Sequence, residues 1–81
     1  MLNEVVSEAV SMTEPPSRSG RRLKILYVTQ PEAHPPHFVF FVNDDKLVHF
    51  SYRRYLENSI RKAFDFTGTP IKLSFVPRKE G

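Results

Sequence analysis

The chain has 81 residues, enough for one small domain, and its 40% hydrophobic content is typical of a folded core rather than of a disordered segment. Cysteine is absent, which excludes disulfide bonds, thiolate catalysis and cysteine-ligated zinc. The formal net charge of +3 is a mild basic bias that is compatible with an anionic partner but not specific for one.

Membrane and export signals are not evident in the sequence. No apolar run approaches the ~20 residues that a membrane-spanning helix needs, and no basic segment precedes a signal-type apolar stretch. We therefore expect a cytoplasmic protein without a membrane partner. We expect one domain over residues 1–81, with an ordered core at about 2–76 and a flexible basic tail at 77–81, and a monomer when it is isolated.

A first helix is predicted over residues 3–12, where apolar residues recur at helical spacing. Asn3 is a good N-cap, and the prolines that follow Glu14 stop the helix. Glu4 and Glu8 make its polar face acidic, which argues against RNA on all sides of the domain and suits contact with a neighbouring domain.

Two strands are predicted next. Residues 15–20 form a loop rich in Pro, Ser and Gly, and residues 21–30 form a strand rich in apolar and β-branched side chains. We expect the three prolines in residues 31–37 to exclude a tight hairpin. Residues 38–43 are apolar on both faces, which indicates a central or well-covered strand.

A second helix is predicted from Ser51, a good N-cap, to the residues before Gly68. Phe50 and Tyr55 are expected to form a hydrophobic staple across its start. Residues 71–76 then alternate between apolar and polar side chains, as in a third strand.

The predicted fold class is α+β with the order α-β-β-α-β. A sheet of three strands needs a cover, and two amphipathic helices on one face can supply it. The last strand–helix–strand unit should cross over right-handed if its two strands are parallel in one sheet. The order of the strands in the sheet is left open.

We expect no catalytic residues and no metal site. A metal needs three or four converging ligands, and two histidines in a proline-rich loop, His34 and His37, with Glu32 close by, are weak evidence for such a site. Ser51 has no acid–base partner, so capping explains it better than nucleophilic catalysis. His49 is interpreted as a surface residue. The phosphate-binding motif Gly-x-x-x-x-Gly-Lys-[Ser/Thr] is absent, so this chain cannot bind or hydrolyse GTP by that mechanism.

Two groups of cationic side chains are the candidate interface residues, for RNA or for another domain. The flank of the second helix carries Arg53, Arg54, Arg61 and Lys62. The start of the first strand carries Arg21, Arg22 and Lys24, with Arg18 shortly before them. Such side chains bind phosphates and release counterions without reading sequence.

Each cationic group also has an alternative explanation. The helix flank is also typical of a solvated surface, in which Glu57 pairs with Arg53 and with Arg61 at ~0.2–0.5 kcal/mol each. The charges at the strand start are also typical of an edge strand that is protected against unwanted pairing. The two groups form one surface only if the fold brings them together.

Several blocks of residues carry a resemblance to a known family. In chain order they are Leu2-Asn3, Pro15-Pro16, Gly20-Arg21-Arg22-Leu23-Lys24-Ile25-Leu26-Tyr27, Thr29-Gln30, Pro35-Pro36-His37-Phe38-Val39, Phe41-Val42-Asn43, Phe50-Ser51-Tyr52-Arg53-Arg54-Tyr55-Leu56-Glu57-Asn58 and Gly68-Thr69-Pro70-Ile71. Together they are similar to the C-terminal KH-like domain of the bacterial tandem GTPases called Der or EngA. The Gly-x-x-Gly clamp of a true KH domain is absent from both the chain and this family.

The resemblance implies a KH-like module at the end of a longer GTPase that assists assembly of the large ribosomal subunit (50S). Its expected partners are the GTPase domains of the same chain and the large subunit with its rRNA. GTP and Mg²⁺ would be bound by the GTPase domains, and this module would hold no cofactor. In the alternative, the module is only an intramolecular scaffold or regulatory domain between two GTPase domains and never contacts RNA.

Overall fold

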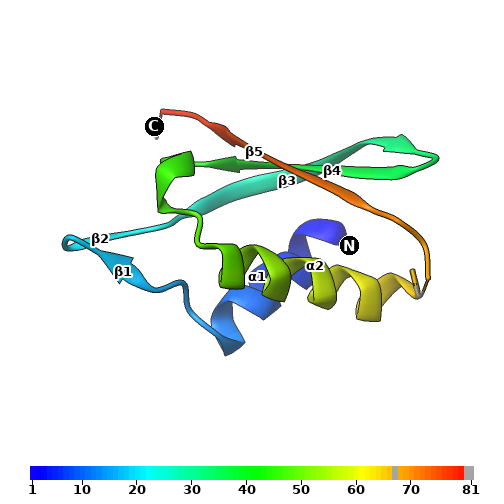
Figure 1. Cartoon of the computed structure of the whole chain (residues 1–81), viewed down its shortest axis with the longest axis horizontal. Coiled ribbons are helices and arrows are strands. Elements are labelled where there is room, and N and C mark those ends of the chain that lie inside the picture. Colours follow the sequence, from blue (N-terminus) through cyan, green and yellow to red (C-terminus); the bar gives the residue numbers. More distant parts are fainter. Residues whose placement is uncertain (67, 80–81) are drawn as a thin grey trace.

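The computed structural model describes residues 1–66 and 68–79 of the chain. Its elements are α1 (Leu2–Met12), β1 (Ser17–Arg18), β2 (Arg21–Arg22), β3 (Ile25–Ala33), β4 (Pro36–Val42), the 3-10 helix η1 (Asp45–Leu47), α2 (Phe50–Phe64) and β5 (Lys72–Pro77). The long strands form one sheet in the order β3-β4-β5, in which β4 is antiparallel to β3 and parallel to β5. Both helices lie on one face of this sheet (Figure 1). The expected α+β architecture is therefore confirmed, with the small β1–β2 hairpin added to it.

The core lies between the sheet and the two helices. Alternate residues of β4 are buried, including Phe38, Phe40 and Val42. Leu56 and Ile60 of α2 pack into the same cluster. Burying these large apolar side chains is the main driving force for a domain of this size, at roughly 25 cal/mol per Å² of apolar surface. The prediction that this apolar strand is central is confirmed, because β4 pairs on both sides.

The other face of the sheet is not covered by a helix (Figure 1). The strand register places Tyr27, Phe41 and Val76 on this open face, opposite in direction to the buried Phe40. Tyr27 and Val76 are accordingly among the exposed large apolar residues.

The first helix begins at Leu2, one residue earlier than predicted, and Asn3 is not its cap. The Asn3 side chain instead bonds to the backbone of Val28. Its Nδ2 donates to the Val28 carbonyl at 3.0 Å, and its Oδ1 accepts from the Val28 N–H at 2.8 Å. The capping prediction was wrong because a partner 25 residues away satisfies this amide.

The predicted first strand is divided in the structure. Residues 21–22, which were predicted to start this strand, pair instead with residues 17–18 in the β1–β2 hairpin. Residues 17–18 lie in the segment that was predicted to be a loop. Strand β3 then begins at Ile25 and continues to Ala33. The continuation to Ala33 carries β3 into the proline-rich segment.

The prediction that prolines exclude a tight hairpin was wrong. Ala33 of β3 pairs with Pro36 of β4, so only two residues connect the strands. The register shifts between Thr29 and Glu32, which places Pro31 at an irregularity of an edge strand. Proline is tolerated at such bulges and at the first residue of a strand, which is the position of Pro36.

The second helix begins at Phe50, with His49 in the N-cap position, so Ser51 lies in the first turn and is not the cap. The predicted staple is also wrong, because Phe50 is 73% exposed. His49 is half-buried rather than a surface residue, and its Nε2 is buried. Strand β5 extends to Pro77, one residue beyond the predicted strand, while Glu80 and Gly81 lie outside the described residues.

Two tyrosines of α2 brace the end of α1. The Tyr52 hydroxyl donates to the Thr13 carbonyl at 2.7 Å, and the Tyr55 hydroxyl donates to the Ala9 carbonyl at 2.6 Å. The two rings lie 5.5 Å apart between centroids. Burial, together with the neighbouring Tyr55, raises the pKa of Tyr52 to about 12. The Ala9 carbonyl thus accepts a second hydrogen bond besides the one from the Thr13 N–H, and the Thr13 carbonyl beyond the helix end gains a partner from α2.

Candidate nucleic-acid interface

The β1–β2 hairpin presents arginines at one end of the molecule. The chain reverses at Ser19 and Gly20, which both have positive φ, at 52° and 74°. This backbone fits the primed turns of two-residue hairpins, and glycine adopts it without strain. The hairpin places Arg18 directly opposite Arg21. A like-charge pair across two strands is destabilising, so this arrangement is not explained by stability.

Asn43 fixes the segment that joins this hairpin to β3. Its side-chain Oδ1 accepts from the Lys24 N–H at 2.8 Å, and its Nδ2 donates to the Arg22 carbonyl at 3.2 Å. The backbone N–H of Asn43 also donates to the Lys24 carbonyl at 3.1 Å. One residue after β4 therefore holds the predicted strand-start cations in a defined place.

The end of β5 adds two further cations to this region. Because β5 runs parallel to β4, the C-terminal ends of both strands lie at the same end of the sheet. The Arg78 N–H donates to the Val42 carbonyl at 2.7 Å. A shallow hollow at this place is lined by Arg21, Asn43, Pro77, Arg78 and Lys79.

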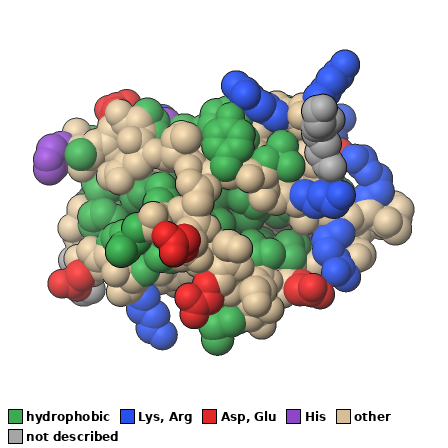
Figure 2. All heavy atoms as spheres, turned by 180° about the vertical axis from the view of Figure 1, so that it is seen from behind, with side chains coloured by type: hydrophobic (Ala, Val, Ile, Leu, Met, Phe, Trp, Pro, Cys, Tyr) green, Lys and Arg blue, Asp and Glu red, His purple; other side chains and the backbone are tan. Residues whose placement is uncertain are grey.

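We call this region the basic end. It consists of Arg18, Arg21, Arg22, Lys24, Arg78 and Lys79. Figure 2 shows that most of the Lys and Arg side chains visible from that side gather at one end of the molecule. The sequence pattern predicted Arg18, Arg21, Arg22 and Lys24 as one group but did not predict Arg78 and Lys79 as their partners. The sequence does contain a basic pair, Arg78 and Lys79, directly after the last strand. The position of this pair beside Arg21 follows only from the parallel pairing of β4 and β5.

Two carboxylates partly neutralise the basic end. Arg21 pairs with Asp44 at 2.9 Å, and Arg22 pairs with Glu14 at 3.2 Å. The two arginine side chains remain 59% and 51% exposed, and such surface pairs contribute little to stability. The hydrogen bond from the Lys46 backbone, followed by that from Arg21, lowers the pKa of Asp44. Asp44 is therefore ionised throughout the neutral range.

The cationic side chains of α2 contact different groups from those of the basic end. Arg53 donates to the Leu73 carbonyl at 3.2 Å, and its guanidinium lies 5.9 Å from the centre of the Phe75 ring. The Arg54 guanidinium lies 5.0 Å from the centre of the Phe50 ring. Both arginines are exposed in the first half of the helix.

Arg61 has a local role at the end of α2. Its guanidinium donates to the carbonyls of Phe66 and Thr69, at 2.9 and 2.6 Å, and pairs with Glu57 at 3.1 Å. The predicted pair with Glu57 is thus confirmed for Arg61. Lys62 is exposed beside the groove between the helices. The structure brings together Arg21, Arg22 and Lys24, and leaves Arg53, Arg54, Arg61 and Lys62 distributed along α2.

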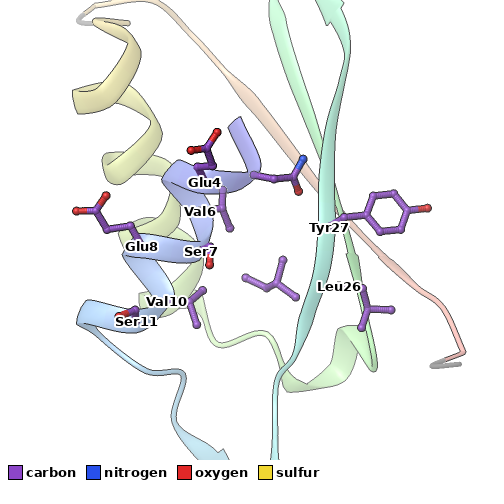
Figure 3. Close-up of a pocket in the computed structure, with 10 residues that line it drawn as sticks. Glu4, Val6, Ser7, Glu8, Val10, Ser11, Leu26 and Tyr27 are labelled. Atoms are coloured by element: carbon purple, nitrogen blue, oxygen red, sulfur yellow. The ribbon is translucent and has the colours of Figure 1, made fainter. Parts of the chain in front are cut away.

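An acidic hollow lies beside α1. Glu4 and Glu8 are on its rim, with Ser7 and Val10 between α1 and β3 (Figure 3). These carboxylates make this side of the domain less suited to a polyanion than the basic end. Glu4 and Glu8 thus lie on a different side of the domain from the hollow that Arg21, Arg78 and Lys79 line.

Residues 1–66 and 68–79 contain no group of three or more His, Cys, Asp or Glu side chains that could hold a metal ion. His37 lies on the open face instead, with its Nε2 2.8 Å from the Ser74 hydroxyl. Among the same residues, no helix is long and apolar enough to cross a membrane.

The fold and sequence define a KH-like module. The family described as KH-domain-like of EngA bacterial GTPase enzymes, C-terminal, matches residues 1–75. The chain belongs to this family. It is 62% identical over 80 residues to GTPase Der of Clostridium novyi (strain NT), which covers 99% of this chain and 18% of that protein. It is 61% identical over 79 residues to GTPase Der of Symbiobacterium thermophilum, which covers 98% of this chain and 17% of that protein. The chain thus spans less than a fifth of the length of these curated relatives.

Proposed function

We propose that this chain is a docking module of a Der-type GTPase that acts in assembly of the large ribosomal subunit. In this proposal the basic end contacts rRNA phosphates, and other surfaces pack against the GTPase domains of the same protein. The module itself carries out no catalysis, and GTP and Mg²⁺ are bound by the GTPase domains. The protein acts in the cytoplasm.

The observation that carries the proposal is the convergence of six cations on one end from three separate segments. A phosphate backbone is recognised mainly through such charges, and affinity then falls steeply with salt. Without a Gly-x-x-Gly loop the usual KH clamp is missing, so contact through phosphates fits this chain better than sequence reading.

The nucleotide state of the GTPase domains would control access to the basic end. A ligand shifts such an equilibrium only if the two states differ in their contacts. The acidic side of α1 supplies a surface of opposite charge that suits packing against a domain rather than against RNA. Docking on the GTPase domains and on rRNA would thus use different sides of one small module.

A pair of matched double variants tests the proposal. Arg18→Glu with Lys79→Glu reverses two charges at the basic end, and Arg54→Glu with Lys62→Glu reverses two charges on α2. We expect the first variant to lose most of its affinity for fragments of large-subunit rRNA, with a smaller slope of log affinity against log salt, by roughly 0.7–0.9 for each lost phosphate contact. The second variant should retain more affinity and a slope closer to that of the original chain.

The scaffold alternative predicts a different result. In that case the unmodified chain binds rRNA fragments no better than an unrelated basic domain of the same net charge. The charge reversals would then change only the contact with the GTPase domains, measured with those domains added separately. Circular dichroism of each variant checks that the fold is retained.

A further inference from the structure

The open face of the sheet carries an aromatic pair with a cation beside it. The Tyr27 and Phe41 rings are stacked, with centroids 4.6 Å apart and planes inclined by 26°. The Arg78 guanidinium lies 4.8 Å from the centre of the Phe41 ring. Because β3 and β5 flank β4 on opposite sides, Tyr27 and Arg78 approach Phe41 from opposite sides. We call these three residues the aromatic row.

The outer ring of the row is accessible. Tyr27 lies on β3, which is an edge strand of the described sheet, so no neighbouring strand faces the side of its ring away from Phe41. Its side chain points away from α1 (Figure 3) and is 38% exposed. Phe41 lies between Tyr27 and Arg78, so the accessible end of the row is the Tyr27 ring.

The aromatic row adjoins the basic end through Arg78. This residue contacts Phe41 with its guanidinium, while its backbone N–H bonds to the Val42 carbonyl. It also lines the shallow hollow with Arg21 and Lys79. A flat aromatic surface and a cluster of cations therefore meet at one residue.

We propose that the aromatic row stacks an unpaired base of an RNA strand whose phosphates lie on the basic end. This inference rests on the proposed function and adds that the RNA is single-stranded at the point of contact. Positively charged grooves with exposed aromatic rings are the general means of binding single strands, since every base has a face that can stack. Paired bases in a duplex are not accessible to a ring in this way.

The rings and cations on the open face of the sheet suit RNA better than an apolar protein partner. An apolar protein surface would gain from the rings but would have to desolvate Arg78 and the neighbouring cations without compensation. A strand of several nucleotides offers a base to the rings and phosphates to the cations at the same time. Recognition would be tolerant of sequence, because stacking does not depend on the hydrogen-bonding edge of the base.

Substitution of Tyr27 tests the stacking contact directly. The Tyr27→Leu variant keeps an apolar side chain and removes the ring, and Tyr27→Phe keeps the ring. We expect Tyr27→Leu to weaken binding of a short single-stranded oligoadenylate about tenfold, and Tyr27→Phe to bind within about twofold of the unmodified chain. Binding of the same oligonucleotide annealed to its complement should be equal for all three proteins.

A fluorescent reporter identifies the place of contact. Because the chain has no tryptophan, Tyr27→Trp introduces a single, selectively excited tryptophan in the row, and Phe50→Trp places a matched one on exposed α2. We expect the oligoadenylate to quench the emission at position 27 and to leave that at position 50 unchanged.

The outcomes separate the two proposals. If Tyr27→Leu binds the single strand as tightly as the unmodified chain, the stacking inference is overturned, while the charge-reversal experiment still decides the proposed function. Equal quenching at both tryptophan positions overturns the inference as well. If the unmodified chain binds neither the single strand nor the duplex, the stacking inference fails, and the proposed function fails with it only if rRNA fragments also do not bind.

Discussion

Asn43 and Asp44 show how two adjacent side chains position and moderate a charged surface. Asn43 holds the strand-start segment by its amide, so that the arginines around it keep a fixed spacing. Asp44 accepts from the Lys46 N–H with one oxygen and from Arg21 with the other. Asp44 therefore caps η1 and also reduces the positive charge of the basic end.

Replacing Asp44 by asparagine should strengthen binding to RNA. The amide oxygen can still accept from the Lys46 N–H, so the cap is retained, while one negative charge beside Arg21 is removed. We expect affinity for an rRNA fragment at low salt to rise roughly twofold to fivefold, the range of an exposed ion pair. Fluorescence anisotropy measures this, with Asp45→Asn as the control. A fall in affinity would show that Arg21 needs its carboxylate partner for binding.

The alkaline limit of stability is expected to depend on Tyr52. The pKa of Tyr52 is raised to about 12, so the folded state favours the protonated hydroxyl that donates to Thr13. Its contribution to stability is fully present below the ordinary tyrosine pKa of about 10 and is lost as pH rises towards 12. Ultraviolet titration should show one late ionisation that is absent from Tyr52→Phe. Identical titration curves for the two proteins would contradict this.

At the scale of elements, α1 is attached to the sheet by a polar contact as well as by packing. Asn3 bonds to both backbone groups of Val28 on the edge of β3, in place of a further strand. The tyrosine hydroxyls of α2 hold the other end of α1. The helix is thus fixed near both of its ends by groups that come from different elements.

Removal of the Asn3 amide should destabilise the domain. Asn3→Ala leaves two backbone groups of a partly buried edge without their partners, and we expect a loss of about 1–3 kcal/mol in the free energy of unfolding. Ser7→Ala, an exposed position on the same helix, is the matched control and should change stability by about 0.5 kcal/mol or less. Urea denaturation measures both variants, and equal midpoints would show that the amide contributes nothing.

Sequence patterns predicted the elements whose formation depends mainly on their own residues. The two helices have amphipathic repeats, and the unbroken apolar run of β4 indicated a central strand, although only alternate residues of β4 are buried. The β1–β2 hairpin has two residues in each strand, which is too short for any periodic pattern. Asn3 could not be assigned correctly because its partner, Val28, is distant in the chain.

The candidate site was predicted only in part, because pairing between distant segments decides which cations lie together. Four of its cations, Arg18, Arg21, Arg22 and Lys24, lie close together in the sequence, and this clustering was enough to single them out. Arg78 and Lys79 join them only because β5 pairs parallel to β4. Conversely, Arg61 has the sequence pattern of a surface cation, whereas its guanidinium holds the chain after α2. Charge patterns thus locate cations but not the groups they bind.

For the whole molecule, RNA binding should raise the melting temperature in a salt-dependent way. A ligand at 100 times its dissociation constant stabilises the folded state by about 2.7 kcal/mol, which for a domain of this size is roughly 10–20 °C. We expect this shift with an rRNA fragment at low salt and its loss at high salt. Scanning calorimetry tests this, with the Arg18→Glu and Lys79→Glu double variant as control. An equal shift at both salt concentrations would exclude a mainly electrostatic contact.

The location of the basic end affects how the domain approaches a polyanion. The molecule measures 36 Å along its longest axis and 22 and 21 Å across, and the cations gather towards one extremity while carboxylates rim the hollow beside α1. The centre of charge is therefore displaced from the centre of mass, and the field of a polyanion exerts a torque on the domain. The isolated domain would rotate so that its basic end faces the polyanion before the two partners come into contact.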